Sequence, residues 1–154
     1  MKVYIGSDHA GFALTQQLLK SLRVTVINLT PEYVDGDDYP DVAETVARKV
    51  AKEKAMGILV CGSAEGMCIA ANKIKGIRAV VGFNEATAFL SRKHNDANVL
   101  CLPGGLFSDE AARKLMKPLP VITAAGIIQT WLDTPFSGEE RHARRIKKIA
   151  ALEK

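Results

Sequence analysis

The 154-residue sequence is poor in cysteine, aromatic residues and long apolar runs. Cys61, Cys68 and Cys101 are an odd number of cysteines, and none forms a Cys-x-x-C pair, so we expect free thiols in a reducing compartment. No apolar run approaches the ~18 residues of a membrane span, and the N-terminal run is too short for a signal peptide. We therefore expect a soluble, cytoplasmic protein with no membrane partner.

Net positive charge is concentrated in one segment of the chain. The formal net charge is +4, and residues 139–154 hold six cations against three glutamates, which leaves the rest of the chain nearly neutral. This distribution predicts a single basic helix at about residues 139–152 rather than a broad nucleic-acid surface. RNA binding through this tail is also disfavoured because no aromatic residue is interleaved with its basic residues.

Short apolar runs alternate with helix-like segments along the chain. The runs are β-branched or apolar throughout, as in strands buried on both faces, and they cover residues 3–5, 24–29, 57–61, 78–83 and 98–102. Between them, leucines recur every four residues from Leu14 to Leu22 and valines from Val42 to Val50, and Phe89 and Leu90 follow a helix-compatible stretch. The pattern predicts one α/β domain over residues 1–154: a doubly wound, Rossmann-like, five-stranded parallel sheet with helices on both faces.

Ligands of such sheets bind outside the carboxyl ends of the strands, which directs attention to the loops there. The loop after residue 61 reads CGSAEG and leads into a helix, so its free backbone N–H groups can hold an anion. The same helix start is expected to lower the pKa of the Cys61 thiol, making it a candidate general base. A buried core thiol is the alternative interpretation.

Two further elements carry candidate chemistry. His9 and His94 lie at strand boundaries, which we interpret as near the ligand edge, whereas a lone histidine of this kind is otherwise a surface or core residue. Helical spacing places Arg141, Arg144, Arg145 and Lys148 on one face, beside His142. That face is either solvated or a fork for a phosphate dianion.

Seven motifs in order give the chain a specific resemblance. It closely resembles the ribose-5-phosphate isomerase B family of sugar-phosphate isomerases, which includes galactose-6-phosphate isomerase, in GSDHAGF, DYPD, the Cys-Gly-Ser loop running into IAANK, GIRA, SRKHNDANVL, TWLDTPF and RHARR. The resemblance implies aldose–ketose isomerisation through a cis-enediolate, with no metal or cofactor. It also implies a homodimer, or a tetramer built on it, with active sites at the interface.

The resemblance assigns roles residue by residue. Cys61 matches the base, Ser63 the hydroxyl serving the sugar oxygens, and Gly62, Gly66 and Asn95 the anion hole. His94 with Asp8 matches the ring-opening pair. The remaining matches bind substrate and phosphate: His9, Tyr39, Arg141, His142 and Arg145.

Three departures from the family pattern bear on the substrate. Ala64 replaces a glycine in a turn that needs positive φ, and Glu65 adds a carboxylate that we expect to point outward. Leu106 stands where the family has a phosphate-binding arginine, and the segment from Leu106 to Trp131 is longer than usual. Ribose 5-phosphate is the leading substrate. Allose or galactose 6-phosphate, and a non-catalytic sugar-phosphate-binding regulator, are the alternatives.

Overall fold

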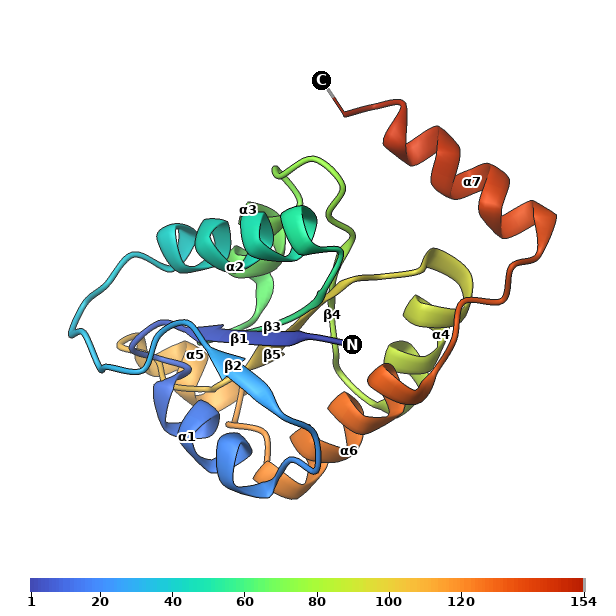
Figure 1. The fold of residues 1–154 in the computed structure, drawn as a ribbon. Helices are drawn as coiled ribbons and strands as arrows, with labels where there is room; N and C mark the ends of the chain where they lie inside the picture. Colours follow the sequence, from blue (N-terminus) through green and yellow to red (C-terminus); the bar gives the residue numbers. More distant parts are fainter. Residues whose placement is uncertain (154) are drawn as a thin grey trace.

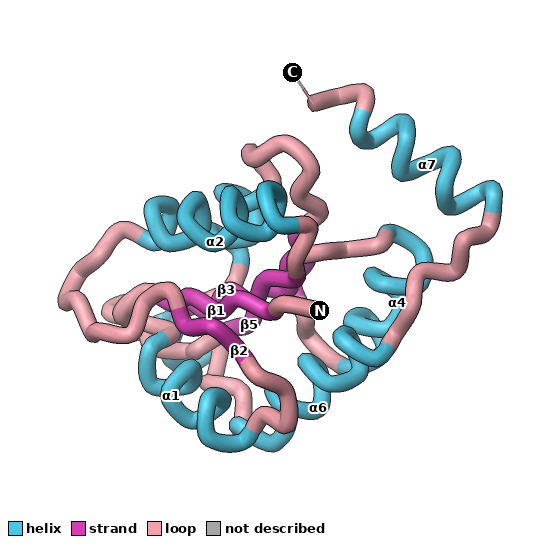
Figure 2. The backbone as a smooth tube through the Cα atoms, in the orientation of Figure 1, coloured by secondary structure: helices cyan, strands magenta, loops and turns pink. Residues whose placement is uncertain are grey.

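The computed structural model describes residues 1–153 and contains a five-stranded, all-parallel sheet with strand order β2-β1-β3-β5-β4 (Figures 1 and 2). The predicted fold is confirmed. In chain order the elements are β1 (Val3–Ser7), α1 (Phe12–Ser21), β2 (Val26–Asn28), α2 (Tyr39–Glu53), β3 (Met56–Cys61), α3 (Glu65–Ala71), β4 (Ala79–Val81), α4 (Glu85–Asn95), β5 (Val99–Pro103), α5 (Glu110–Leu115), α6 (Val121–Asp133) and α7 (Glu140–Ala150).

The core is divided into two layers by the alternation of strand side chains. Leu59 and Cys61 of β3 face the layer beneath α2 and α3, whereas Ile58 and Val60 face the layer beneath α1, α4 and α6. Trp131 of α6 is completely buried in the second layer. Helices therefore cover both faces of the sheet, which explains why its strands are apolar throughout.

The helical periodicities seen in the sequence correspond to buried stripes. Leu14 and Leu18 of α1 are buried, as are Val42, Val46 and Val50 of α2. The prediction for α4 located the helix but not its buried face: Phe89 and Leu90 are substantially exposed, and Ala88 and Ser91 are buried instead. Small residues therefore form the buried side of α4.

The order of the strands places a topological switch point between β1 and β3. The chain passes from β1 to β2 on one side, and then to β3 on the other side of β1. A crevice is expected where the carboxyl ends of two such strands diverge. The ends of β1 and β3 at this crevice carry Asp8 and Cys61.

The basic helix α7 stands apart from the body, and its main helix contact is with α4 (Figure 1). Glu153, just beyond α7, accepts a hydrogen bond from the Gly76 N–H at 3.0 Å. Within residues 1–153, no helix combines the length and apolarity needed to cross a membrane.

Candidate active site

A pocket of about 490 Å³ lies at the carboxyl ends of β1 and β3. It contains seven of the residues predicted from the sequence, together with a wall contributed by the segment after β5. Its lining residues are Asp8, His9, Ala10, Tyr39, Cys61, Gly62, Ser63, Gly66, Leu106, Phe107, Ser108 and Asp109. The pocket therefore lies at the carboxyl edge of the sheet, at the switch point where a crevice is expected.

Cys61 is buried at the end of β3, where the loop into α3 begins. The backbone N–H groups of Met67, Ala64 and Ser63 act on the thiol in the direction that favours its ionised form, as expected of an anion-stabilising loop. The expected pKa shift, however, was wrong in direction. Burial raises the pKa of the Cys61 thiol and outweighs the three N–H groups, and the Asp8 carboxylate adds to the rise.

The start of α3 differs from the glycine-rich loop of the resembling family. Ala64 adopts φ 72° and ψ −23°, in the left-handed region, so the turn forms with alanine in place of glycine. Glu65 is exposed and lies outside the pocket lining, as expected. Gly66 admits the Tyr39 ring, because a Cβ at Gly66 would lie 2.7 Å from Tyr39 Cε2.

Asp8 is only 4% exposed and sits where β1 turns into α1. Its Oδ1 accepts a hydrogen bond from the Gly11 N–H at 2.9 Å. Gly11 is required there, since a Cβ would lie 2.0 Å from the Val60 carbonyl oxygen. Burial raises the pKa of Asp8, and the Gly11 N–H opposes this rise.

His9 is held at the pocket by Asp37, a residue that sequence reasoning missed. Asp37 Oδ1 lies 2.8 Å from the His9 backbone nitrogen, which donates to it, and 2.9 Å from Nδ1 of the ring. Asp37 belongs to the loop between β2 and α2, two residues before Tyr39. The DYPD motif was the available signal, because it places this acidic loop near the pocket.

The segment after β5 supplies a wall that the sequence did not predict. Phe107 packs on the Cys61 loop so closely that a Cβ at Gly62 would lie 3.0 Å from its ring. Leu106 also lines the pocket and is 56% exposed. The beginning of the long segment thus covers the loop that contains Ser63.

The remaining predicted residues form a second group, away from this pocket. His94 and Asn95 end α4 at the amino edge of the sheet, which corrects the expectation that His94 lies at the ligand edge. The ring of His94 stacks on that of His142, with centroids 4.3 Å apart. Arg141 pairs with Glu139 at 2.7 Å, and Arg145 is exposed.

His142 anchors α7 to the body of the protein. It is 3% exposed, and its Nδ1 lies 2.7 Å from Ser137 Oγ. Burial lowers the pKa of His142, and the positive charge of His94 lowers it further. Within one chain, therefore, neither the His94–Asp8 pair nor the grouping of Asn95 with the Cys61 loop is formed.

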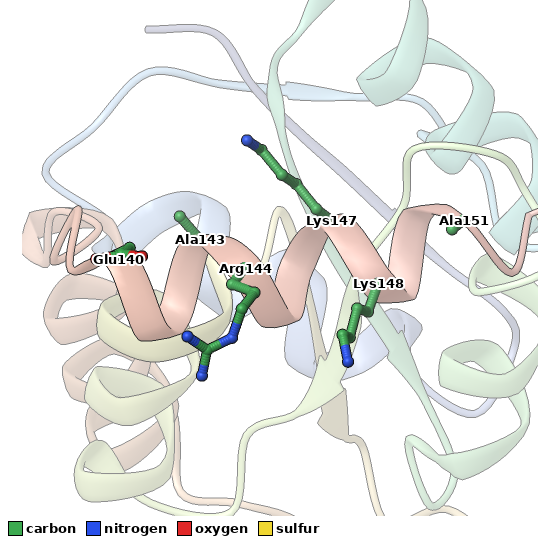
Figure 3. Close-up of a pocket in the computed structure, with 6 residues that line it drawn as sticks. All are labelled: Glu140, Ala143, Arg144, Lys147, Lys148 and Ala151. Carbon is green, nitrogen blue, oxygen red and sulfur yellow. The ribbon is translucent and has the colours of Figure 1, made fainter.

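The exposed side of α7 carries a separate hollow of about 420 Å³ (Figure 3). Arg144 and Lys148 point the same way, as the helical spacing predicted, whereas Lys147 points to the opposite side (Figure 3). All of its lining residues come from α7 and the residue after it: Glu140, Ala143, Arg144, Lys147, Lys148 and Ala151. The hollow is a basic helix surface and contains none of the pocket residues near Cys61.

A thiol, a buried carboxylate and backbone N–H groups at the switch point of a parallel sheet define an α/β enzyme suited to proton transfer on a small anionic molecule. The family model described as Ribose/Galactose Isomerase matches residues 3–149. The chain therefore belongs to the ribose/galactose isomerase family, and it is an isomerase.

Individual relatives support this assignment over the full length. Ribose-5-phosphate isomerase B of Escherichia coli (strain K12) is 38% identical over 156 residues, which cover 99% of this chain and 96% of that protein. The structure of Trypanosoma brucei type B ribose 5-phosphate isomerase superposes with a TM-score of 0.87 at 42% identity, covering 99% and 98% of the two chains. The Mycoplasma genitalium enzyme with bound ribulose-5-phosphate gives 0.84 at 38% identity, covering 99% and 95%.

Proposed function

We propose that this isomerase interconverts ribose 5-phosphate and ribulose 5-phosphate through a cis-enediolate, with Cys61 as the base and without a metal or cofactor. The observation that carries the proposal is the position of the buried Cys61 thiol at the end of β3, in the same pocket as Asp8. The bound ribulose-5-phosphate in the Mycoplasma genitalium relative supports the choice of substrate.

The proposed proton transfer uses the residues around the Cys61 loop. The Cys61 thiolate removes the proton from C2 of the open-chain aldose, and the negative charge that develops on O1 is stabilised by N–H donors. The thiol then returns the proton to C1. Ser63 moves the hydroxyl proton between O2 and O1, so that the product is the ketose and no atom is gained or lost.

Burial and Asp8 raise the pKa of Cys61, and a cation brought close to the thiol would favour its ionised form. Arg141 and Arg145 are cationic side chains of α7, and neither lines the pocket of its own chain. We therefore propose a homodimer in which α7 and the end of α4 of one subunit complete the pocket of the other.

In this dimer the second group of residues meets the first across the interface. His94 from one subunit opens the sugar ring with Asp8 of the other, and Asn95 completes the anion hole. His9, Arg141 and Arg145 hold the phosphate, with His142 beside them and Tyr39 along the wall. Phosphate is well matched to arginine forks, because each guanidinium can donate two parallel hydrogen bonds.

A panel of pentose and hexose phosphates tests the substrate. Coupled assays should give the highest kcat/KM with ribose 5-phosphate, and dialysis against EDTA should leave the rate unchanged. Allose 6-phosphate and galactose 6-phosphate are the competing substrates, because Leu106 and Phe107 alter the wall that senses sugar and phosphate.

The Cys61→Ala variant tests the base, and Cys68→Ala is its matched control. It should lose about a hundred- to ten-thousandfold in kcat while still binding ribose 5-phosphate, and Cys68→Ala, which changes a thiol outside the pocket lining, should keep its rate. Full activity in Cys61→Ala would remove Cys61 as the base.

A further inference from the structure

The contact between His9 and Asp37 makes these two residues a structural unit. A single carboxylate oxygen, Asp37 Oδ1, receives both the His9 backbone N–H at 2.8 Å and the ring Nδ1 at 2.9 Å. The His9 side chain is 37% exposed and that of Asp37 is 20% exposed. With Nδ1 committed to Asp37, Nε2 is the nitrogen of His9 that remains for a ligand.

We propose that Asp37 is a positioning residue that fixes the ring of His9 and keeps it positively charged, so that His9 Nε2 donates to the substrate phosphate. This inference rests on the proposed role of His9 as a phosphate anchor. Asp37 contacts Nδ1 of His9 and leaves Nε2 for the phosphate. Its role is therefore to orient the imidazole and to stabilise its positive charge, and it does not bind phosphate itself. Histidine–carboxylate pairs commonly fix the tautomer and orientation of an imidazole.

The loop that carries Asp37 connects β2 to α2 across the surface. Gly36, immediately before it, has φ +64°, a conformation that allows the turn, and Asp38, immediately after it, is the N-cap of α2. Earlier in the loop, the Tyr33 ring packs edge-on against Phe12 with centroids 5.5 Å apart. Asp37 is itself less exposed than its neighbours, and its two contacts with His9 connect this loop to the end of β1.

The charges around His9 agree with a cationic imidazole. The hydrogen bond to Asp37 raises the pKa of His9, partial burial opposes the rise, and the carboxylates of Asp8 and Asp35 reinforce it. The other titratable groups lining the pocket are Tyr39, Cys61 and Asp109. Since the folded-state pKa is raised, the charged form of His9 persists to higher pH than an isolated imidazole would allow.

The first experiment measures the ionisation of His9 without any substrate. The chain has only three histidines, so their ring proton resonances can be followed by NMR against pH and assigned with a His9→Gln variant. Asp37→Asn should lower the pKa of His9, whereas Asp35→Asn, the matched control on the same loop, should have a much smaller effect. An unchanged His9 titration in Asp37→Asn would overturn the proposal.

The second experiment measures phosphate recognition with inorganic phosphate as the probe. At pH 8, Asp37→Asn should weaken phosphate inhibition and raise KM about five- to twentyfold with kcat nearly unchanged, the scale of losing charge from a charge-assisted hydrogen bond. Below about pH 6 the variant and the parent should converge, because an ordinary imidazole is protonated there. Asp37→Glu, which keeps the carboxylate, should recover part of the loss.

These measurements separate the inference from the proposed function. Weaker phosphate binding to Asp37→Asn, found together with no turnover of ribose 5-phosphate by the parent protein, would support the role of Asp37 and contradict the substrate. Equal phosphate binding by the parent, Asp37→Asn and Asp35→Asn across the pH range would overturn the role of Asp37. A fall in kcat with KM unchanged would also overturn it, because positioning of the phosphate anchor acts on binding.

Discussion

Ala64 shows how much local strain the Cys61 loop tolerates. Its φ of 72° costs an L-residue about 1–2 kcal/mol relative to the right-handed region. Its methyl group is completely buried, which returns about 0.8 kcal/mol, and its carbonyl accepts a hydrogen bond from the Cys68 N–H at 3.1 Å. The turn that aims the N–H groups at Cys61 is therefore preserved despite the loss of glycine.

Glu65, the next residue, gives a prediction about charge beside the anion hole. Glu65→Gln should leave kcat within a few fold of the parent, because the side chain is exposed and outside the pocket lining. The same change should cost about 0.5 kcal/mol of stability, since Glu65 is the first residue of α3 and favours the helix dipole. Steady-state kinetics and urea unfolding measure the two effects, and a large loss of kcat with binding intact would instead place Glu65 in proton transfer.

At the level of elements, the segment between β5 and α6 divides into a pocket wall and an exposed helix. Gly105, with φ +71°, starts it, and a Cβ there would lie 2.3 Å from the Pro118 nitrogen, so the segment closes back on its own beginning. Phe107 then covers Gly62, while α5 remains exposed, with no buried residue. The start of the segment forms a wall of the pocket, and the rest lies exposed on the surface.

Leu106 is the position in this segment where a charge can be restored. Leu106→Arg should lower KM for ribose 5-phosphate about tenfold, corresponding to about 1.5 kcal/mol from one added charge-assisted hydrogen bond to phosphate. Leu115→Arg is the matched control, since Leu115 is 88% exposed on α5 and outside the pocket lining. Steady-state kinetics compare the two.

An unchanged KM in Leu106→Arg would contradict this prediction and indicate that another cation already fills the position. The candidates are in the same segment, and the structure gives two of them local partners. Lys114 pairs with Glu110 at 2.7 Å, and Lys117 donates to the Arg113 carbonyl at 2.9 Å. Alanine substitution of Arg113, Lys114 and Lys117 would then identify the cation by its effect on KM.

The elements themselves could be predicted from the sequence because their signals are local. Five apolar runs gave the five strands, and the repeats of Leu14 and Val42 gave the first two helices. The order of the strands was not predicted, since it depends on contacts between distant segments. The buried face of α4 was also missed, because small residues such as Ala88 fill it.

The site was predicted where motifs mark residues and missed where partners come from elsewhere. Cys61 and Asp8 were placed at the carboxyl edge of the sheet from their strand ends, whereas their closeness depends on the pairing of β1 with β3. The raised pKa of Cys61 depends on burial, which no local pattern reports. Phe107 reaches the pocket from a segment without a motif, and Asp37, although it directly precedes DYPD, is recognised only by its contacts with His9.

Over the whole molecule, the two groups of candidate residues lie at opposite ends of the strands. Asp8 follows the carboxyl end of β1, and His94 precedes the amino end of β5, so at least one five-residue strand length, about 17 Å, separates them. Helix α7, which carries Arg141 and Arg145, projects from the body (Figure 1). This separation supports the proposal that two chains share each active site.

Mixing two inactive variants tests the shared site. Cys61→Ala and His94→Ala should each be nearly inactive, but after denaturation and refolding together about half of the dimers are mixed, and each mixed dimer has one site with both residues intact. About a quarter of the parental activity should return. The control mixes Cys61→Ala with Ser63→Ala, which alter the same half of the site, and should recover nothing; equal recovery in the two mixtures would contradict a site built from two chains.

The position of the two groups on opposite ends of one chain has a consequence for inheritance. In the proposed dimer, a chain with an inactivating substitution in the Cys61 loop still supplies its intact α4 and α7 to a normal partner made in the same cell. Every mixed dimer then keeps one complete active site, so such an allele lowers the total activity without inactivating the normal chain. A substitution that prevents pairing removes both centres of any pair that it disrupts, which makes the subunit boundary the more vulnerable target for mutation.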